Sequence, residues 1–251
     1  MAAFADRWII VSGASSGIGR AISIELAGQG ARIVLMGRNT DRLHETAALC
    51  GSAHRTLVCP LDLADLQGVA PAVRALVQKT GRIYGLCHAA GQLQMLPLSA
   101  TRPDRLRALM DVNFSAGLEL SRVLVERSVM AEQGGSILWI SSVAAHVGSP
   151  GQTAYCATKG AIGAAIRAMA VELAPRRIRV NAVSPGMVQT EMAAAVGTRL
   201  SDDQMSRIEA LHPLGVGKPE DVARAASFLL NPINAWITGV DLVIDGGYTL
   251  Q

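Results

Sequence analysis

Short apolar runs alternate with segments of helical periodicity along the whole chain, and this alternation constrains its fold more than any other feature. Seven runs of strand type occupy residues 8–11, 32–36, 55–60, 84–89, 136–141, 178–183 and 241–244. Apolar positions recur at helical spacing in 18–27, from Asn39 or Thr40 to 49, from Asp62 or Asp65 to 79, and in 103–131 and 155–173. Strands that are apolar on both faces belong in a parallel sheet that helices cover on both sides. With right-handed crossovers, residues 1–251 are predicted to form a single α/β domain around a doubly wound, seven-stranded parallel sheet.

The composition excludes several classes of protein. Half of the residues are hydrophobic and 17% are charged, which is unlike a disordered chain. Aromatic residues make up 4% and the formal charge is +3 without a basic run, so we predict no binding of nucleic acid. The sequence lacks a long apolar stretch or a signal-peptide core, so we expect no membrane association. The four cysteines have spacings that fit neither a zinc site nor a disulfide framework. We therefore expect free thiols, no metal and a cytoplasmic location.

The first predicted strand runs into a glycine-rich turn with the sequence Gly13-Ala-Ser-Ser-Gly-Ile-Gly19. Glycines at these positions permit a tight turn, close approach of a diphosphate to the backbone, and close contact between helix and sheet. The helix that follows adds free N–H groups and the positive end of its dipole. Turns also use glycine for purely conformational reasons. Because this turn joins a strand to a helix, we predict nucleotide contacts at Gly13, Ser15, Ser16, Gly17, Ile18 and Gly19.

The second predicted strand ends at Gly37 and Arg38, and the next acidic residue is Asp41. In dinucleotide sites an acid at this edge bonds the ribose 2′-hydroxyl, whereas an Arg accommodates a 2′-phosphate. An Arg at the start of a helix is also common. With the glycine turn upstream, we interpret Arg38 as a ligand for a 2′-phosphate and predict NADP(H) as the cofactor. NAD(H) stays possible, since the glycine turn itself contains no basic residue.

Tyr155 and Lys159 are four residues apart near the start of a predicted helix, so they share one face. Ser142 follows the fifth predicted strand, and the carboxyl ends of parallel strands face the same cleft as the phosphate turn. A phenol with a pKa of about 10 is a poor acid–base catalyst at neutral pH. A neighbouring ammonium favours the phenolate and lowers that pKa. We therefore predict that Tyr155 exchanges a proton with a carbonyl oxygen that Ser142 holds, and that Lys159 lowers the pKa of Tyr155.

These motifs, in this order and over essentially the whole length, resemble the short-chain dehydrogenase/reductase family, and in particular its 3-oxoacyl-(acyl-carrier-protein)-reductase-like members. The turn from Ser12 to Gly19 resembles the cofactor loop of the family, with Ser12 where Thr is usual. Asp62-Leu63 resembles the pair that touches the adenine. His88-Ala-Ala-Gly91 is similar to the Asn-Asn-Ala-Gly element, with His88 and Ala89 in place of both asparagines. Residues 181–186 with Thr190 resemble the segment that closes over the nicotinamide, and residues 237–247 resemble the family's ending.

The resemblance implies a Rossmann-like fold and an NADP(H)-dependent enzyme that interconverts a small-molecule carbonyl and a secondary alcohol. It implies a catalytic set of Asn113, Ser142, Tyr155 and Lys159, in which Asn113 holds a water molecule of a proton relay from Lys159. It implies further cofactor contacts at Asp62, Leu63, Ala90, Gly91, Tyr155, Lys159, Pro185, Gly186, Val188 and Thr190. It also implies a homotetramer, with the helices that start near residues 103 and 155 packed across a two-fold axis.

The substrate is less constrained than the reaction. Residues 187–214 are expected to cover it, and their Met and Ala residues suit an uncharged, moderately apolar carbonyl compound, although such residues usually pack in cores. His146, between Ser142 and Tyr155, either lines the substrate site or is an exposed loop residue. Two other functions stay open because a fold alone does not establish a function. One is a non-catalytic NADP(H)-binding regulator, and the other is a sugar-nucleotide epimerase or dehydratase, which would usually need a further substrate domain.

Overall fold

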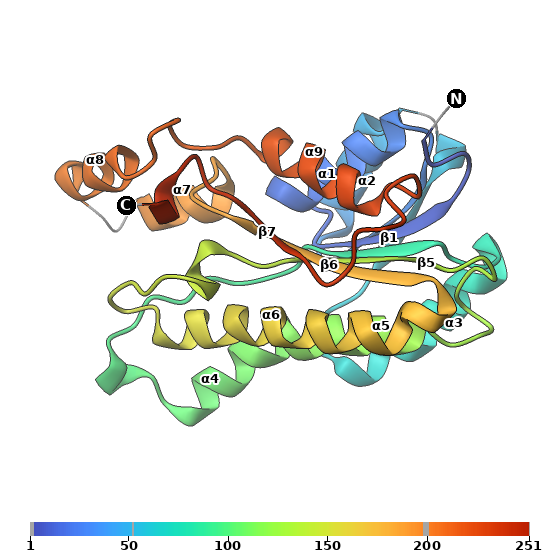
Figure 1. The fold of residues 1–251 in the computed structure, drawn as a ribbon, viewed down its shortest axis with the longest axis horizontal. Coiled ribbons are helices and arrows are strands. Elements are labelled where there is room, and N and C mark those ends of the chain that lie inside the picture. Colours follow the sequence, from blue (N-terminus) through green and yellow to red (C-terminus); the bar gives the residue numbers. More distant parts are fainter. Residues whose placement is uncertain (1–2, 52, 198–200, 251) are drawn as a thin grey trace.

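Seven parallel strands form one sheet in the part of the chain that the computed structural model describes, residues 3–51, 53–197 and 201–250. The strand order is β3-β2-β1-β4-β5-β6-β7 (Figure 1). The strands are β1 (Trp8–Ser12), β2 (Arg32–Gly37), β3 (Thr56–Pro60), β4 (Gly85–His88), β5 (Gly135–Ile140), β6 (Ile178–Pro185) and β7 (Asp241–Ile244). The predicted doubly wound parallel sheet is therefore confirmed, and each strand lies within a few residues of its predicted position.

Helices cover both faces of this sheet (Figure 1). One face carries α1 (Gly17–Gly28), α2 (Thr40–Leu49) and α9 (Pro219–Leu230). The other carries α3 (Leu66–Thr80), α4 (Pro103–Met110), α5 (Ala116–Leu124) and α6 (Thr153–Leu173). Two short helices, α7 (Glu191–Gly197) and α8 (Asp202–Ala210), lie together at one end of the molecule. Both belong to the segment expected to cover the substrate, of which residues 198–200 lie outside the described part.

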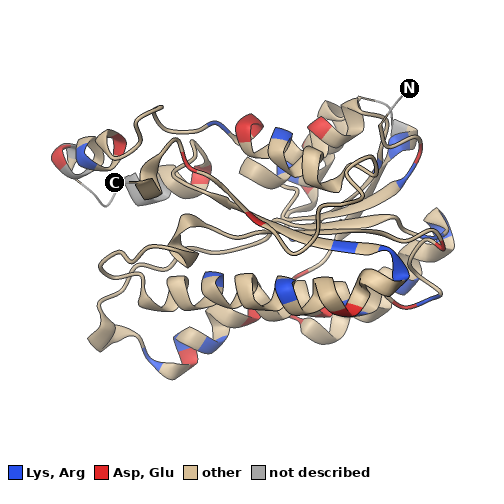
Figure 2. Cartoon of the chain, viewed as in Figure 1, with Lys and Arg blue, Asp and Glu red and all other residues tan. Residues whose placement is uncertain are grey.

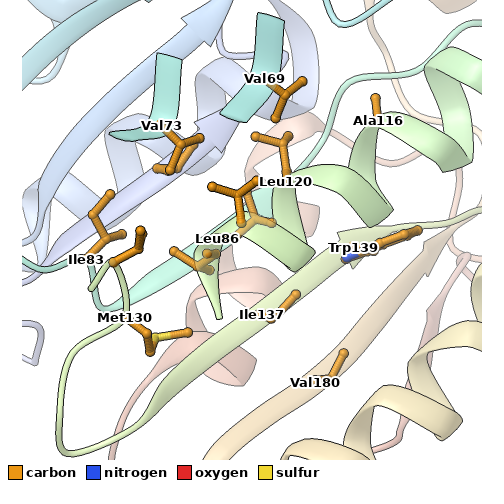
Figure 3. Close-up of a cluster of buried hydrophobic side chains, with 14 of the residues drawn as sticks. Val69, Val73, Ile83, Leu86, Ala116, Leu120, Met130, Ile137, Trp139 and Val180 are labelled. Atoms are coloured by element: carbon orange, nitrogen blue, oxygen red, sulfur yellow. The ribbon is translucent and has the colours of Figure 1, made fainter. Parts of the chain in front are cut away.

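The sheet has a separate apolar core on each face, because successive strand residues point to opposite sides. In β1, Ile10 belongs to the core under α3, α5 and α6, whereas Ile9 and Val11 belong to the core under α1, α2 and α9. Figure 3 shows part of the first core, in which Leu120 of α5 lies near strand side chains and Trp139 of β5 is fully buried. Burial on both faces explains why the inner strands are predominantly apolar.

Two helix starts are set by polar side chains. The Asn39 side chain accepts a hydrogen bond from Arg42 N at 3.0 Å and begins α2, and the Asp65 side chain accepts one from Gly68 N at 3.3 Å and begins α3. Such caps satisfy N–H groups that have no partner within the helix. The sequence allowed Asn39 or Thr40 as the start of the second helix and Asp62 or Asp65 as the start of the third. The structure has Asn39 as the cap of α2 and Asp65 as the cap of α3.

The helices differ from the sequence-based expectation in two places. The helix predicted over residues 103–131 is divided, because a π-helical turn at Asp111–Ser115 separates α4 from α5, and α5 ends at Leu124. The structure also has a helix to which no sequence prediction corresponds, α9, between residues 214 and 241. Pro219 at the first position and the acids Glu220 and Asp221 in the first turn are typical of a helix start.

Charged residues of both signs are interspersed over the helices (Figure 2). None of the helices in the described residues is long and apolar enough to span a membrane.

Candidate active site

A groove runs past the carboxyl ends of β1, β2 and β4, where the chain leaves the sheet. The predicted cofactor residues that line it are Gly13, Ser15, Ser16, Gly17, Ile18, Gly19, Arg38, Asp62, Leu63, Ala90, Gly91 and Thr190. The groove is also lined by residues that were not predicted to contact the cofactor, namely Gly37, Leu61, Ala89, Gln92, Val112, Glu191 and Met192. The fold therefore brings most of the predicted cofactor residues together.

The glycine turn at the centre of the groove has a shape that only glycine allows. Gly13 has φ +71°, and a Cβ atom there would lie 2.7 Å from Ala90 N. A Cβ atom on Gly19 would collide with the Gly13 carbonyl oxygen. The turn leads directly into α1, whose first N–H groups have no partner within the helix and attract an anion. This bare backbone cradle fits the diphosphate of a dinucleotide.

The corner of the groove after β2 contains Arg38, which is exposed and lines the groove. A Cβ atom on Gly37 would lie 3.7 Å from Ser15 Oγ, so the hydroxyl of the glycine turn approaches this corner. Arg38 and Ser15 can both donate hydrogen bonds to a phosphate. Asp62 and Leu63 follow β3 and form the adjoining wall.

Tyr155 and Lys159 lie one turn apart on α6, as their spacing predicts. The Lys159 Nζ atom donates to the Ile140 carbonyl at 2.9 Å and lies 5.7 Å from the centroid of the Tyr155 ring. The side chain is buried, and burial lowers the pKa of Lys159 to about 8. Burial raises the pKa of the Tyr155 phenol, and the Ser142 hydroxyl opposes this effect. The pKa of Tyr155 is therefore raised and not lowered as expected, because the loss of hydration outweighs the effect of the Ser142 hydroxyl.

Ser142 follows β5 and begins a short 3-10 turn, Val143–Ala145. Its Oγ atom accepts a hydrogen bond from Ala144 N at 3.2 Å, which leaves the hydroxyl hydrogen available to another acceptor. The preceding residue, Ser141, is buried and donates to the Lys159 carbonyl oxygen at 3.4 Å. The two serines thus point to different sides, and Ser141 ties β5 to α6.

Asn113 lies fully buried in the π-helical turn, and its side chain is held on three sides. Its Nδ2 atom donates to Gln92 O at 2.9 Å and to Thr158 Oγ1 at 3.1 Å, while its Oδ1 atom accepts from Gln92 N at 2.7 Å. A Cβ atom on Gly91 would lie 3.4 Å from Asn113 Oδ1 and 3.6 Å from Lys159 Nζ. Position 91, at the wall of the groove, is therefore where both polar groups converge.

His88 replaces an asparagine of the family element and is buried at the end of β4. Its Nδ1 atom forms a hydrogen bond with Ser12 Oγ at 2.8 Å. Burial and the positive charge of Lys159 lower the pKa of His88 to about 3, so the imidazole is neutral at physiological pH. Gly117 makes room for the ring, because a Cβ atom there would lie 2.6 Å from His88 Cδ2. His88 thus joins the ends of β1 and β4 beside the groove.

The segment after β6 folds back over the glycine turn. The Thr190 hydroxyl accepts a hydrogen bond from Ala193 N at 3.2 Å at the start of α7, and a Cβ atom on Gly17 would lie 3.2 Å from Thr190 Cγ2. Among the predicted cofactor residues, Pro185, Gly186, Val188, Tyr155 and Lys159 are not part of the groove lining.

His146 is the exposed loop residue among the two alternatives proposed from the sequence, since it follows the 3-10 turn Val143–Ala145 and does not line the groove. Its Nε2 atom lies 3.0 Å from Asp241 Oδ2 and 3.3 Å from Ser184 Oγ, so the ring joins the loop after Ser142 to β6 and β7. Cys156, next to Tyr155, has its Sγ atom 3.9 Å from Val147 O. Within the described residues, no cluster of His, Cys, Asp and Glu is arranged to hold a metal ion.

Comparison with known proteins finds matches over nearly the whole chain. Residues 13–249 match the family model described as enoyl-(acyl carrier protein) reductase. The chain is 33% identical to 3-oxoacyl-(acyl-carrier-protein) reductase FabG of Thermotoga maritima, over 96% of this chain and 97% of that protein. It is 34% identical to D-threitol dehydrogenase of Mycolicibacterium smegmatis, over 96% of this chain and 92% of that protein.

Solved structures of similar proteins have the same fold. A short-chain type dehydrogenase/reductase from Mycobacterium ulcerans aligns with a TM-score of 0.90 and 31% identity, over 99% of this chain and 91% of that one. A protein described as an NAD(P) dependent gluconate 5-dehydrogenase, from Beutenbergia cavernae, aligns with a TM-score of 0.91 and 33% identity, over 98% of each chain. NADP is bound to that protein at low occupancy.

Proposed function

Because the chain belongs to the short-chain dehydrogenase/reductase family of oxidoreductases, we propose that it interconverts a carbonyl and a secondary alcohol with NADP(H), and less effectively with NAD(H). The observation that carries the proposal is the position of Lys159 and Asn113. Both converge on position 91 in the wall of a groove that also contains the glycine cradle. A reacting group held against that wall would lie within reach of the polar side chains that acid–base chemistry requires.

Each part of the groove has a role toward the dinucleotide in this proposal. Backbone N–H groups at Gly13–Gly19 hold the diphosphate, Arg38 and Ser15 hold the 2′-phosphate, and Asp62 and Leu63 contact the adenine. Ala90 and Gly91 contact the nicotinamide end, together with Pro185, Gly186, Val188 and Thr190. When bound, the dinucleotide supplies or accepts the hydride, while the protein supplies geometry and proton transfer.

Tyr155 gives its proton to the carbonyl oxygen during reduction and takes it back during oxidation. Ser142 orients that oxygen, because its hydroxyl hydrogen is available once its oxygen has accepted from Ala144 N. Lys159 stabilises the negative charge that develops on the Tyr155 oxygen as its proton leaves, since at pH 7 an ammonium with a pKa of about 8 is mostly charged. Lys159 also contacts the nicotinamide ribose, and Asn113 holds a water molecule through which Lys159 exchanges protons with solvent.

The substrate in this proposal is an uncharged, moderately apolar carbonyl compound covered by residues 187–214. Met187 and Met192 lie at the start of that segment, and Met205 lies on α8. We also infer that residues 1–251 act as one domain and that the location is cytoplasmic. The four cysteines are free thiols, as is usual in a reducing compartment.

The experiment that tests this proposal is a screen of NADPH oxidation, followed at 340 nm, with ketones and aldehydes of several classes. We expect turnover with at least one class and none in a Tyr155→Phe control. Tight NADPH binding without turnover of any class would instead identify a non-catalytic regulator.

A further inference from the structure

A carboxylate lies in the wall of the groove that we assign to an anionic dinucleotide. Glu191 is the first residue of α7 and lines the groove with Gly17 and Arg38. A Cβ atom on Gly17 would lie 3.5 Å from Glu191 Oε2, which is ordinary contact distance. Although the Glu191 side chain is about half exposed, at 52%, its charged end therefore lies beside the first residue of α1.

The start of α1 is a favourable place for a negative charge. The first N–H groups of a helix have no partner within it, and they form the positive end of the helix dipole. The first turn of α1, Gly17-Ile-Gly-Arg20, contains no acid of its own. Glu191 brings a carboxylate to this position from a distant part of the sequence. In the proposed function, the diphosphate of the cofactor binds to the same N–H groups at the start of α1.

Arg42 forms an ion pair with Glu191. Its Nη2 atom lies 3.5 Å from Glu191 Oε1, so the ion pair joins α2 to α7 across the glycine turn. The two side chains are 45% and 52% exposed, and ion pairs that water reaches this well contribute little free energy. An incoming ligand with greater negative charge can therefore displace the carboxylate.

We propose that Glu191 sets the affinity of the cofactor site by occupying its diphosphate end, so that a dinucleotide binds only after this carboxylate has moved away. The inference rests on the proposed function. Two negative groups cannot share one helix start without mutual repulsion, and Glu191 lowers the affinity for any dinucleotide.

Glu191→Gln tests the inference, because it removes the charge and keeps the size of the side chain. Equilibrium titrations in low-salt buffer, followed by the fluorescence of NADPH and NADH, measure affinity without a substrate. We expect Glu191→Gln to bind both dinucleotides roughly three- to tenfold more tightly than the wild type. The gain should be similar for the two, since both carry the diphosphate, and it should shrink in 0.5 M salt as charges are screened.

Glu220→Gln is the matched control. Glu220 is also an exposed acid in the first turn of a helix, α9, but it does not line the groove. It should leave both affinities unchanged. Equal binding by Glu191→Gln and the wild type would overturn the inference. Weaker binding by Glu191→Gln would also overturn it, because the Arg42–Glu191 pair would then close over bound cofactor. A gain confined to NADPH would also overturn it, since Glu191 would then oppose the 2′-phosphate. Binding by neither wild type nor variant would overturn the proposed cofactor too.

Discussion

Tyr155 carries the proton in the proposed reaction, and only its hydroxyl group takes part. Tyr155→Phe removes that group and keeps the ring. We predict that kcat falls by about 10² or more, as is typical for the loss of a general acid–base group, while the dissociation constant of NADPH changes little. Steady-state kinetics and a fluorescence titration measure the two quantities. Turnover at the rate of the wild type would contradict the role of Tyr155.

The charge on Lys159 makes the rate depend on pH. Burial lowers its pKa to about 8, so the ammonium is charged below that pH and loses its proton as the pH rises through it. We predict that kcat for carbonyl reduction declines above about pH 8. In Lys159→Arg, whose guanidinium stays charged, this decline should move to higher pH even though kcat is lower. A decline at the same pH in both proteins would assign it to another group.

Arg38 controls the choice between the two cofactors in our proposal. Hydrogen bonds between a guanidinium and a phosphate contribute roughly 1.5–3 kcal/mol, so we predict a preference for NADPH over NADH of about ten- to a hundredfold in kcat/KM. Gly37→Asp with Arg38→Ala should invert it, because a carboxylate repels the phosphate and accepts from ribose hydroxyls. A Cβ atom at Gly37 has room, since its nearest neighbour is Leu43 Cδ2 at 3.5 Å. A wild type that prefers NADH would contradict the role of Arg38.

At the scale of elements, the sequence predicts a helix or strand best where residues within that element determine its conformation. All seven strands could be predicted because each contains a short apolar run; β1, β2, β4, β5 and β6 are almost completely buried, whereas the edge strands β3 and β7 are partly exposed. The π-helical turn at Asp111–Ser115 could not, since helical periodicity continues through it. α9 could have been found, because Pro219, two acids and apolar residues at helical spacing mark its start and its buried face.

In the candidate site, too, some residues could be predicted from the sequence and others could not. Residues just beyond the ends of strands, such as Gly13, Arg38 and Ser142, could be predicted because parallel strands end at one edge. The contact of Glu191 with the glycine turn could not, since it depends on how the chain after β6 folds back. The exchange of asparagine for His88 is visible in the sequence, but its pairing with Gly117 requires the structure.

His212 joins elements that surround the segment after β6. Its Nε2 atom accepts from Met187 N at 3.1 Å, its Nδ1 atom lies 2.8 Å from Ile208 O of α8, and its ring stacks on Tyr248. We predict that His212→Phe, which keeps a stacked ring but loses both hydrogen bonds, lowers kcat/KM several-fold. The control Tyr248→Phe should have little effect. Unchanged kinetics in His212→Phe would show that these bonds do not support the site.

On the scale of the whole molecule, two separate surfaces suit contact with further copies of the chain. Trp236 is fully exposed and Ile233 is 82% exposed, both between α9 and the edge strand β7. The exposed residues Ala157, Gly160 and Ala164 of α6 are small enough for a second helix to approach closely. Two different self-complementary surfaces on one chain generate a tetramer with two-fold symmetry.

We therefore predict a homotetramer, with four times the 26.3 kDa mass of the chain. Because each variant removes one kind of contact, Ala164→Glu and Trp236→Glu should each yield dimers, and the double variant should yield monomers. Sedimentation equilibrium at micromolar concentration measures these masses, and Leu49→Glu, on the exposed side of α2, serves as a control. A wild type that sediments as a monomer would contradict the prediction.

The common direction of the seven strands has a consequence for how such a chain can diversify. The turns that follow β1 and β2 and the segment that follows β6 meet at one edge, yet they belong to separate stretches of sequence. Loops at such an edge tolerate exchange better than the scaffold that carries them. A recombination that replaces only the part of that stretch beyond Met192 could therefore confer a new metabolic role on the descendant, because the residues assigned to the cofactor would be kept.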